Sequence, residues 1–325
     1  MASQSLHQTI NKLWYGGNKL AYLLTPLSSV FSLMSSIRKH KQQSKQIKFQ
    51  CPVIIVGNIT VGGTGKTPMV ITLANELHQH GFKIGIASRG YKSQAVQPVL
   101  VNELHTVAEV GDETLLIFRN AQTPIMVGNN RVSVIQALID KCRCDLVICD
   151  DGLQDYRFNH DVEIIMVDGE RVFGNQQLLP AGPLRENISR LQQADFVVAS
   201  SKVIPAISND YMKLNLNEAV NLLNGEVTPI SYWQNETVHA IAGIGNPSRF
   251  FNALRAQNLN IIEHEFPDHA MLNKQDVTFS DQKPVLMTEK DAVKCRDYGL
   301  NNLWFIPMQV ELPQDFISRV VQKLK

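Results

Sequence analysis

The sequence has few cysteines and almost no net charge, and these two shortages exclude several classes of protein. A formal charge of +1 over 325 residues gives no global reason to expect a nucleic-acid partner. The cysteines are Cys51, Cys142, Cys144, Cys149 and Cys295, and because their number is odd a disulfide framework is not expected. Cys149 lies inside the apolar run DLVICD, which argues against a zinc site. With 44% apolar and 19% charged residues, the composition is that of a reduced, globular enzyme.

Acidic residues are missing from the beginning of the chain. The first is Glu76, whereas eight lysines and arginines precede it: Lys12, Lys19, Arg38, Lys39, Lys41, Lys45, Lys48 and Lys66. A basic front end on a nearly neutral protein indicates contact with an anionic surface.

Residues 19–41 combine this charge with a helical apolar pattern. Serines fall mainly on one side of this helix. On the other side, apolar side chains recur at steps of three and four residues: Leu20, Leu23, Leu24, Leu27, Val30, Phe31, Met34 and Ile37. The serines make a spanning helix less expected, and the late position of the apolar stretch does not fit a signal peptide. The pattern favours an amphipathic helix in the membrane interface, bent near Pro26. A spanning helix and a helix packed on its own domain remain alternatives.

Apolar runs of strand length alternate with helical stretches over most of the chain. Strands are expected at CPVIIVGN, FKIGIASRG, VQPVLVN, TPIMVG, CDLVICDDG, VEIIMVDG and ADFVVASS, with helices over 67–80, 112–120 and 130–142. This alternation predicts an α/β fold, a doubly wound parallel sheet of the P-loop NTPase type, followed by a second, smaller α/β domain. We expect a membrane-associating segment over 1–48, a P-loop domain over 49–205, a hinge over 206–232 and the smaller domain over 233–325.

The stretch VGNITVGGTGKTP, Val56 to Pro68, predicts a nucleotide site. A buried strand leads into a glycine-rich turn that ends in Gly-Lys-Thr and opens a helix, which is the context of a P-loop. Its amides, the helix N-terminus and the lysine would hold the phosphates, and the threonine would bind Mg²⁺. The expected nucleotide contacts are Thr60, Val61, Gly62, Gly63, Thr64, Gly65, Lys66 and Thr67, where Thr60 replaces the usual first glycine.

A second part of such a site is an acidic residue at the end of another strand. The run DLVICDDG ends in Asp150 and Asp151. A carboxylate at a strand end is often only a turn former, but beside a P-loop it is typical of Mg²⁺ coordination. ATP or GTP and Mg²⁺ are therefore the expected ligands.

Further short motifs follow in a fixed order: SRGY (88–91), VGDET (110–114), DDGLQ (150–154), AGPLRE (181–186), AIAGIGNPSRFF (240–251), FPDH (266–269) and TEKDAVK (288–294). Together with the P-loop, over about residues 10–310, this series closely resembles the tetraacyldisaccharide 4'-kinases of Gram-negative lipid A synthesis. The resemblance implies transfer of the ATP γ-phosphoryl group to the 4'-hydroxyl of a tetraacylated glucosamine disaccharide 1-phosphate. It also implies that this reaction takes place at the cytoplasmic face of the bacterial inner membrane.

The resemblance gives roles to residues that spacing alone would not single out. By itself, Asp112 reads as an acid that stabilises the start of a helix, as does Glu113. The resemblance implies instead that Asp112 is the catalytic base, paired with His269, and that Lys66 also acts in catalysis. His160 and His264 are weaker candidates for the histidine.

Four residues are candidate phosphate, substrate or metal contacts. Arg185 in AGPLRE and Arg89 in SRGY could meet a phosphate, with Glu113 as a further contact, and Glu186 could hold metal or water. Two positions depart from the pattern of the family: Ala270 where a second histidine or aromatic residue is common, and Asp155 where histidine is common after DDGLQ.

Two other functions share some of these features. A membrane-docked nucleotide switch acting on a protein partner would need the P-loop, the two aspartates and the basic helix, but not Asp112 or His269. A soluble kinase for a small metabolite would leave the N-terminal segment without a purpose. We therefore expect the lipid kinase.

Overall fold

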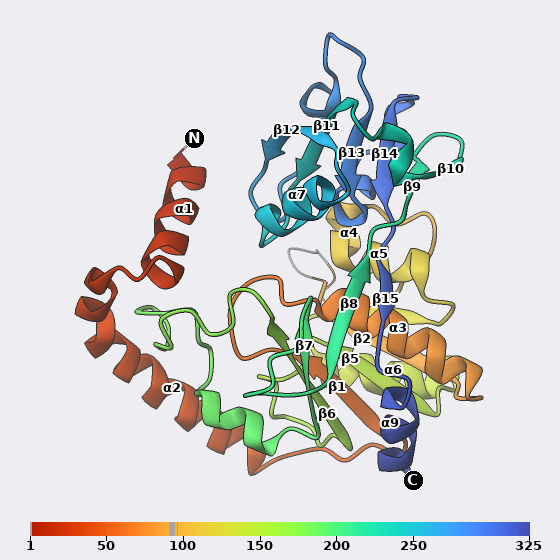
Figure 1. Ribbon diagram of the computed structural model, residues 1–325. Helices are drawn as coiled ribbons and strands as arrows, with labels where there is room; N and C mark the ends of the chain where they lie inside the picture. Colours follow the sequence, from red (N-terminus) through yellow and green to blue (C-terminus); the bar gives the residue numbers. More distant parts are fainter. Residues whose placement is uncertain (1, 91–94, 96) are drawn as a thin grey trace. The chain divides into compact units, whose positions relative to one another are not determined.

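The computed structural model describes residues 2–90, 95 and 97–325, and the chain divides into two compact units (Figure 1). The large unit consists of Ser5–Lys213 and Val310–Lys325, and the body of the small unit is Leu214–Gln309.

The large unit contains a nine-stranded sheet whose central strands are parallel. Its order is β15 (Gln309–Glu311), β8 (Tyr211–Asn215), β7 (Phe196–Ser200), β6 (Val162–Asp168), β1 (Val53–Gly57), β5 (Leu146–Asp150), β2 (Ile84–Ser88), β4 (Ile125–Val127) and β3 (Val99–Leu100). Strands β1, β2, β5 and β6 are buried along their whole length, as expected of apolar runs covered on both faces. The expected stretch VQPVLVN forms only the short edge strand β3, antiparallel to β4.

The large unit also contains helices, some of which pack against this sheet. They are α1 (Ala2–Tyr15), η1 (Lys19–Leu24), α2 (Thr25–Gln43), α3 (Lys66–Gln79), α4 (Val107–Val110), α5 (Asp112–Asn120), α6 (Arg131–Cys142), η2 (Ile188–Gln193) and α9 (Phe316–Leu324). Helix α3 contacts β1, β2 and β5, while α6 contacts β2 and β4. In α6, Val134 and Leu138 share a core cluster with Val53 and Ile55 of β1. The α/β fold expected from the sequence is confirmed.

The small unit has a sheet of its own. Its order is β10 (Val227–Pro229), β9 (Glu218–Asn221), β14 (Leu303–Ile306), β13 (Val285–Thr288), β11 (Thr237–Ala242) and β12 (Asn260–Glu265). The four strands from β14 to β12 are parallel, and β9 and β10 add an antiparallel edge. Its helices are η3 (Ile230–Trp233), α7 (Pro247–Ala256), η4 (Lys274–Val277), α8 (Glu289–Ala292) and η5 (Arg296–Tyr298).

Two segments lie in other places than the sequence suggested. Residues 206–232, expected as a hinge, contain β8 of the large sheet and β9 and β10 of the small one. Helix α9, expected in the smaller domain, belongs to the large unit, because Phe316 is fully buried with its ring 5.3 Å from that of Phe196. Lys323 adds an ion pair with Asp195 at 2.9 Å. A short amphipathic helix can pack on any apolar surface, so its sequence does not reveal its partner.

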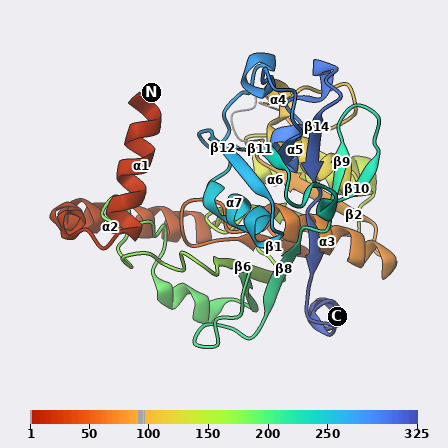
Figure 2. The ribbon, with the colours of Figure 1, turned by 45° about the horizontal axis from the view of Figure 1, so that its top comes forward.

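The N-terminal segment presents its apolar side chains outward. Figure 2 shows α1 and α2 as two separate helices that meet at an angle. Leu23 is 76% exposed and Leu33 62%, whereas Ser28 is buried and its hydroxyl donates to the Leu178 carbonyl at 2.7 Å. Pro26 lies in the first turn of α2, where a missing backbone N–H costs no hydrogen bond, so the break falls at the η1–α2 junction. The helical segment Lys19–Gln43 has an 18-residue stretch of mean hydropathy 1.5, of which 11% is buried. By length and composition it could therefore also cross a membrane, despite its serines.

Candidate nucleotide site

The loop after β1 is shaped by glycines and ends at the N-terminus of a helix. Gly62 and Gly65 have φ angles of 104° and 90°, in a region that favours glycine. Gly65 is the N-cap of α3, a helix of 14 residues whose first residue is Lys66. The partial positive charge of that helix end and the lysine ammonium thus lie at the same loop.

Thr60 departs from the P-loop pattern without disturbing the loop. It is buried and forms an antiparallel bridge with Leu184, so it is extended and needs no glycine. The neighbouring Val61 amide donates to the Pro183 carbonyl at 2.8 Å, and the Arg185 amide donates to the Ile59 carbonyl at 2.7 Å. Thr60 therefore belongs to the contact that brings the AGPLRE segment beside the loop.

The Lys66 ammonium lies between two oxygen acceptors. Its Nζ donates to Asn58 Oδ1 at 3.1 Å and is 3.5 Å from Asp151 Oδ1. Asn58 is fully buried, and sequence analysis did not single it out. Its place directly after the strand, in VGN, is the only local signal that could have drawn attention to it.

Asp150 and Asp151 end a strand that lies directly beside the P-loop strand. In the parallel pair β1–β5, Val56 is the partner of Asp150, so both carboxyl ends meet at one edge of the sheet. Asp150 is 4% exposed, and its Oδ1 has no hydrogen-bond partner among the described residues. Burial, and then the negative charges of Glu113 and Asp151, raise the pKa of Asp150 to about 7.

The pKa of Asp151 is shifted in the opposite direction. Burial would raise the pKa of Asp151, but the Lys66 and Arg185 charges outweigh it and bring that pKa well below its usual range. The Arg185 guanidinium lies 3.3 Å from Asp151 Oδ2. A buried carboxylate oxygen without a donor, beside another acidic group, is the kind of position that suits a divalent cation. These residues therefore fit the expected Mg²⁺.

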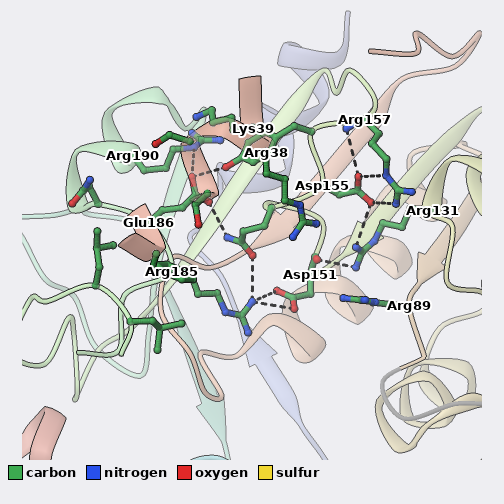
Figure 3. Close-up of a pocket in the computed structure, with 18 of the residues that line it drawn as sticks. Arg38, Lys39, Arg89, Arg131, Asp151, Asp155, Arg157, Arg185, Glu186 and Arg190 are labelled. Carbon is green, nitrogen blue, oxygen red and sulfur yellow. Dashed lines mark hydrogen bonds and ion pairs between the residues drawn. The ribbon is translucent and has the colours of Figure 1, made fainter. Parts of the chain in front are cut away.

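The other expected metal ligands are Glu186 and Thr67, and the structure supports this role less clearly for them than for Asp150 and Asp151. Glu186 accepts from Gln154 Nε2 at 2.9 Å and from the Tyr156 hydroxyl at 2.7 Å, and it forms an ion pair with Arg190 (Figure 3). Thr67, the second residue of α3, is half-buried. Within the described part of the chain, no three His, Cys, Asp or Glu residues converge on a metal position. Mg²⁺ commonly uses one or two carboxylates and completes its shell with water and phosphate oxygens.

A cavity of about 620 Å³ opens beside these groups. Arg89, Glu113 and Arg185 line it together with Asp150 and Asp151, and Arg38 and Lys39 reach it from α2 (Figure 3). The cavity is thus formed by side chains of both signs, and its cationic side chains are of the kind that binds phosphate groups. Gln154 connects its parts, since it donates to the Asn58 carbonyl at 3.0 Å and accepts from Arg185 at 3.3 Å.

Asp112 and His269 belong to different units, so their pairing stays a prediction. Asp112 is 4% exposed at the start of α5, and its Oδ1 accepts from the Glu113 amide at 2.9 Å. His269 has a φ angle of 59° and lies in a turn that Ala270 closes, with its amide donating to the Pro267 carbonyl.

The environment of His269 in the small unit is charged. Its Nε2 is 3.3 Å from Lys290 Nζ and 3.7 Å from Asp268 Oδ2, and Lys290 also contacts Asp268 at 3.0 Å. The weaker histidine candidates have structural contacts: His160 lies 3.3 Å from Glu163, and His264 is hydrogen-bonded to His239 at 2.9 Å.

The opposite pKa shifts of the two aspartates predict opposite effects of pH. Asp150 binds its proton more tightly in the folded than in the unfolded protein, because its pKa is raised from 3.8 to about 7. The free energy of unfolding is therefore higher at low pH, and this contribution is lost as the pH rises toward 7. Asp150→Asn should therefore stabilise the protein more at pH 8 than at pH 5, by about 2 kcal/mol. Asp151→Asn, the matched control, should destabilise it at pH 8, because it removes a favourably paired anion. Urea unfolding without Mg²⁺ or nucleotide measures both, and equal effects of Asp150→Asn at the two pH values would contradict this.

The chain matches the family model described as tetraacyldisaccharide-1-P 4'-kinase over residues 20–325. It is 43% identical over 320 residues to the tetraacyldisaccharide 4'-kinase of Nitrosococcus oceani, covering 97% of this chain and 94% of the relative. It is also 43% identical over 307 residues to that of Ruthia magnifica, covering 93% and 97%. The crystal structure of the Aquifex aeolicus enzyme, LpxK, in complex with ATP has a TM-score of 0.79 and 25% identity, over 94% of this chain and all of that one. With the P-loop and its carboxylates at one sheet edge, these matches show that the chain belongs to the tetraacyldisaccharide 4'-kinase family.

Proposed function

We propose that the protein transfers the γ-phosphoryl group of ATP to the 4'-hydroxyl of a tetraacylated glucosamine disaccharide 1-phosphate, giving lipid IVA. The observation that carries this proposal is the buried carboxylate of Asp150, whose Oδ1 has no donor among the described residues, at the strand end beside the P-loop and in a cavity lined by several cationic side chains. Family membership selects the acceptor.

The P-loop holds the triphosphate. The amides from Gly62 to Thr67 and the N-terminus of α3 contact the phosphate oxygens, and Lys66 exchanges its bonds to Asn58 and Asp151 for bonds to phosphate. Asp150, Asp151 and the Thr67 hydroxyl would hold Mg²⁺, with Glu186 close to the same cavity. The bound ion supplies positive charge for the phosphate oxygens.

In the reaction step the 4'-oxygen forms a bond to the γ-phosphorus while the bond to the ADP oxygen breaks. Asp112 accepts the proton of the attacking hydroxyl, and His269 orients and polarises Asp112. Charge develops on the phosphoryl oxygens and on the ADP leaving group, where Lys66, Arg89 and Arg185 can neutralise it. Glu113 lies on the cavity wall, where it contacts the acceptor or its phosphate.

The acceptor carries four acyl chains and stays in the bilayer, which gives the N-terminal segment a use. The exposed apolar side of α2 enters the membrane interface of the cytoplasmic face, and Arg38 and Lys39 meet anionic headgroups next to the cavity. No nucleic-acid partner is involved.

Charges on the exposed side of α2 are expected to release the protein from membranes. The double variant Leu27→Glu/Leu33→Glu should bind anionic phospholipid vesicles at least about ten-fold more weakly, because two side chains that are 56% and 62% exposed can no longer be buried in lipid. Leu104→Glu, at a leucine that is 90% exposed elsewhere, is the control and should bind normally. Vesicle sedimentation measures the three proteins, and unchanged binding of the double variant would contradict docking through this surface.

The test of the function itself uses detergent-solubilised acylated disaccharide 1-phosphate. ADP formation should depend on this lipid, and the product should carry new phosphate on its 4'-oxygen. ATP hydrolysis at the same rate without lipid would favour the nucleotide switch, and phosphorylation of deacylated sugars alone would favour a soluble kinase.

A further inference from the structure

One buried arginine holds the backbone of the turn that carries both aspartates. Arg131 is the first residue of α6, and its side chain is 7% exposed. Its Nη2 donates to the Asp150 carbonyl at 2.6 Å and to the Asp151 carbonyl at 2.8 Å (Figure 3). A single guanidinium thus binds two consecutive carbonyl oxygens at the end of β5.

That turn has a conformation that needs support. Asp151 has a φ angle of 51°, which lies in the left-handed region that residues other than glycine rarely adopt. The conformation directs the two neighbouring carboxylates into different surroundings. Asp151 lies beside Lys66 and Arg185, while Asp150 Oδ1 is buried without a donor.

The guanidinium of Arg131 lies beside the carboxylate of Asp155. The Asp155 side chain is 8% exposed and lies between two guanidinium groups. It accepts from Arg157 Nε at 2.7 Å and Nη2 at 2.6 Å, and its Oδ2 is 3.9 Å from Arg131 Nη1. A histidine could not accept two parallel N–H bonds from Arg157, and it would leave the charges of the two arginines uncompensated.

The contacts form a closed ring around the turn. Arg157 Nη1 also donates to Asn130 Oδ1 at 3.3 Å, and Asn130 is the N-cap of the helix that Arg131 opens. The Asp155 amide donates to the Gly152 carbonyl at 3.0 Å, within the same DDGLQ segment. Among the described residues, Arg131 is the side chain that connects the Asp155 carboxylate with the Asp150 and Asp151 carbonyls.

We propose that Asp155 and Arg131 are positioning residues, which fix the turn so that the Asp150 and Asp151 carboxylates can hold the divalent cation of the bound nucleotide. This rests on the proposed function only in assigning the cation to these two carboxylates. Arg157 is the partner that keeps the Asp155 carboxylate in place.

The test measures how strongly Mg²⁺ enhances nucleotide binding. ADP affinity is determined by calorimetry with Mg²⁺ and with EDTA, for the unchanged protein and for Asp155→Asn. The P-loop contacts do not involve Asp155, so affinity in EDTA should stay within about two-fold, while the Mg²⁺ enhancement should fall about ten-fold. Asp140→Asn on the exposed side of α6, where Asp140 accepts a hydrogen bond from Gln136, serves as control and should keep both affinities.

Two results would overturn the proposal. One is an unchanged Mg²⁺ enhancement in Asp155→Asn, and the other is an equal loss of affinity in EDTA and in Mg²⁺, which would indicate general damage to the fold. Should Asp155→Asn fail to fold, Arg157→Gln, at a side chain that is 37% exposed, must lower the enhancement in the same direction. The measurement needs no lipid acceptor, so a failure to phosphorylate lipid would reject the proposed function and leave this result intact.

Discussion

Replacing Lys66 with alanine is expected to lower kcat for lipid phosphorylation by about 10²–10³-fold, the usual cost of removing a preorganised charge from a transition state. The Lys66 ammonium is the cation at the first residue of α3, and it already lies 3.1 Å from Asn58 and 3.5 Å from Asp151. A water molecule in its place cannot match a fixed ammonium against the charge that develops on the phosphoryl oxygens.

Initial rates at saturating ATP and lipid measure this effect. Lys83→Ala is the matched control, since Lys83 is exposed before β2 and should leave the rate unchanged. Urea unfolding checks that the Lys66 variant is folded. We expect it to fold, because Asp151 keeps Arg185 as a partner at 3.3 Å. A folded Lys66→Ala enzyme with normal ATP affinity and normal kcat would mean that the loop after β1 does not hold the reacting phosphates.

Replacing Asp112 with asparagine is expected to reduce kcat by about 10²–10⁴-fold, the contribution of a positioned general base. The amide has nearly the same shape and can still accept from the Glu113 amide, as the Asp112 carboxylate does at 2.9 Å, but it cannot take the proton of the 4'-hydroxyl. ATP affinity should change little, because the base contacts the acceptor and not the nucleotide.

The lipid-dependent and lipid-independent rates of ADP formation decide what Asp112 does. Glu109→Gln, at an exposed capping residue of α4, is the control and should keep full activity. The double variant Asp112→Asn/His269→Ala should be no slower than Asp112→Asn alone if the two residues act as one unit. A lipid-independent ATPase rate that is untouched by Asp112→Asn, with no lipid phosphorylation in the unchanged protein, would favour the nucleotide switch.

The local parts of the nucleotide site were predictable because the chain itself sets their spacing. A buried strand, a glycine turn and a helix follow one another over Val53–Gln79, and no distant residue is needed to recognise them. The aspartates at the end of β5 could likewise be placed beside the P-loop, because carboxyl ends of parallel strands share one edge of a sheet. Thr60 looked like a defect only because its partner, Leu184, is far away in the sequence.

Other parts of the site were beyond sequence reasoning. Gln154 joins Asn58, Arg185 and Glu186 through side-chain hydrogen bonds, and glutamine has no local pattern that announces such a role. Asp155 appeared as an unexplained departure until its two arginine partners were visible. The end of the chain was assigned to the wrong neighbours for the same reason, since α9 packs against Phe196 of the large unit.

The sequence by itself determined the alternation of strands and helices in the P-loop domain, the phosphate loop and the family, because each can be recognised from short stretches of consecutive residues. Only the tertiary structure decided that Asp150 and Asp151, which are neighbours, have pKa values shifted in opposite directions. It also decided that the serine side of α2 faces the protein while the leucines face outward. Burial and the distance to charges on other elements set these properties, and both arise only when distant segments pack together.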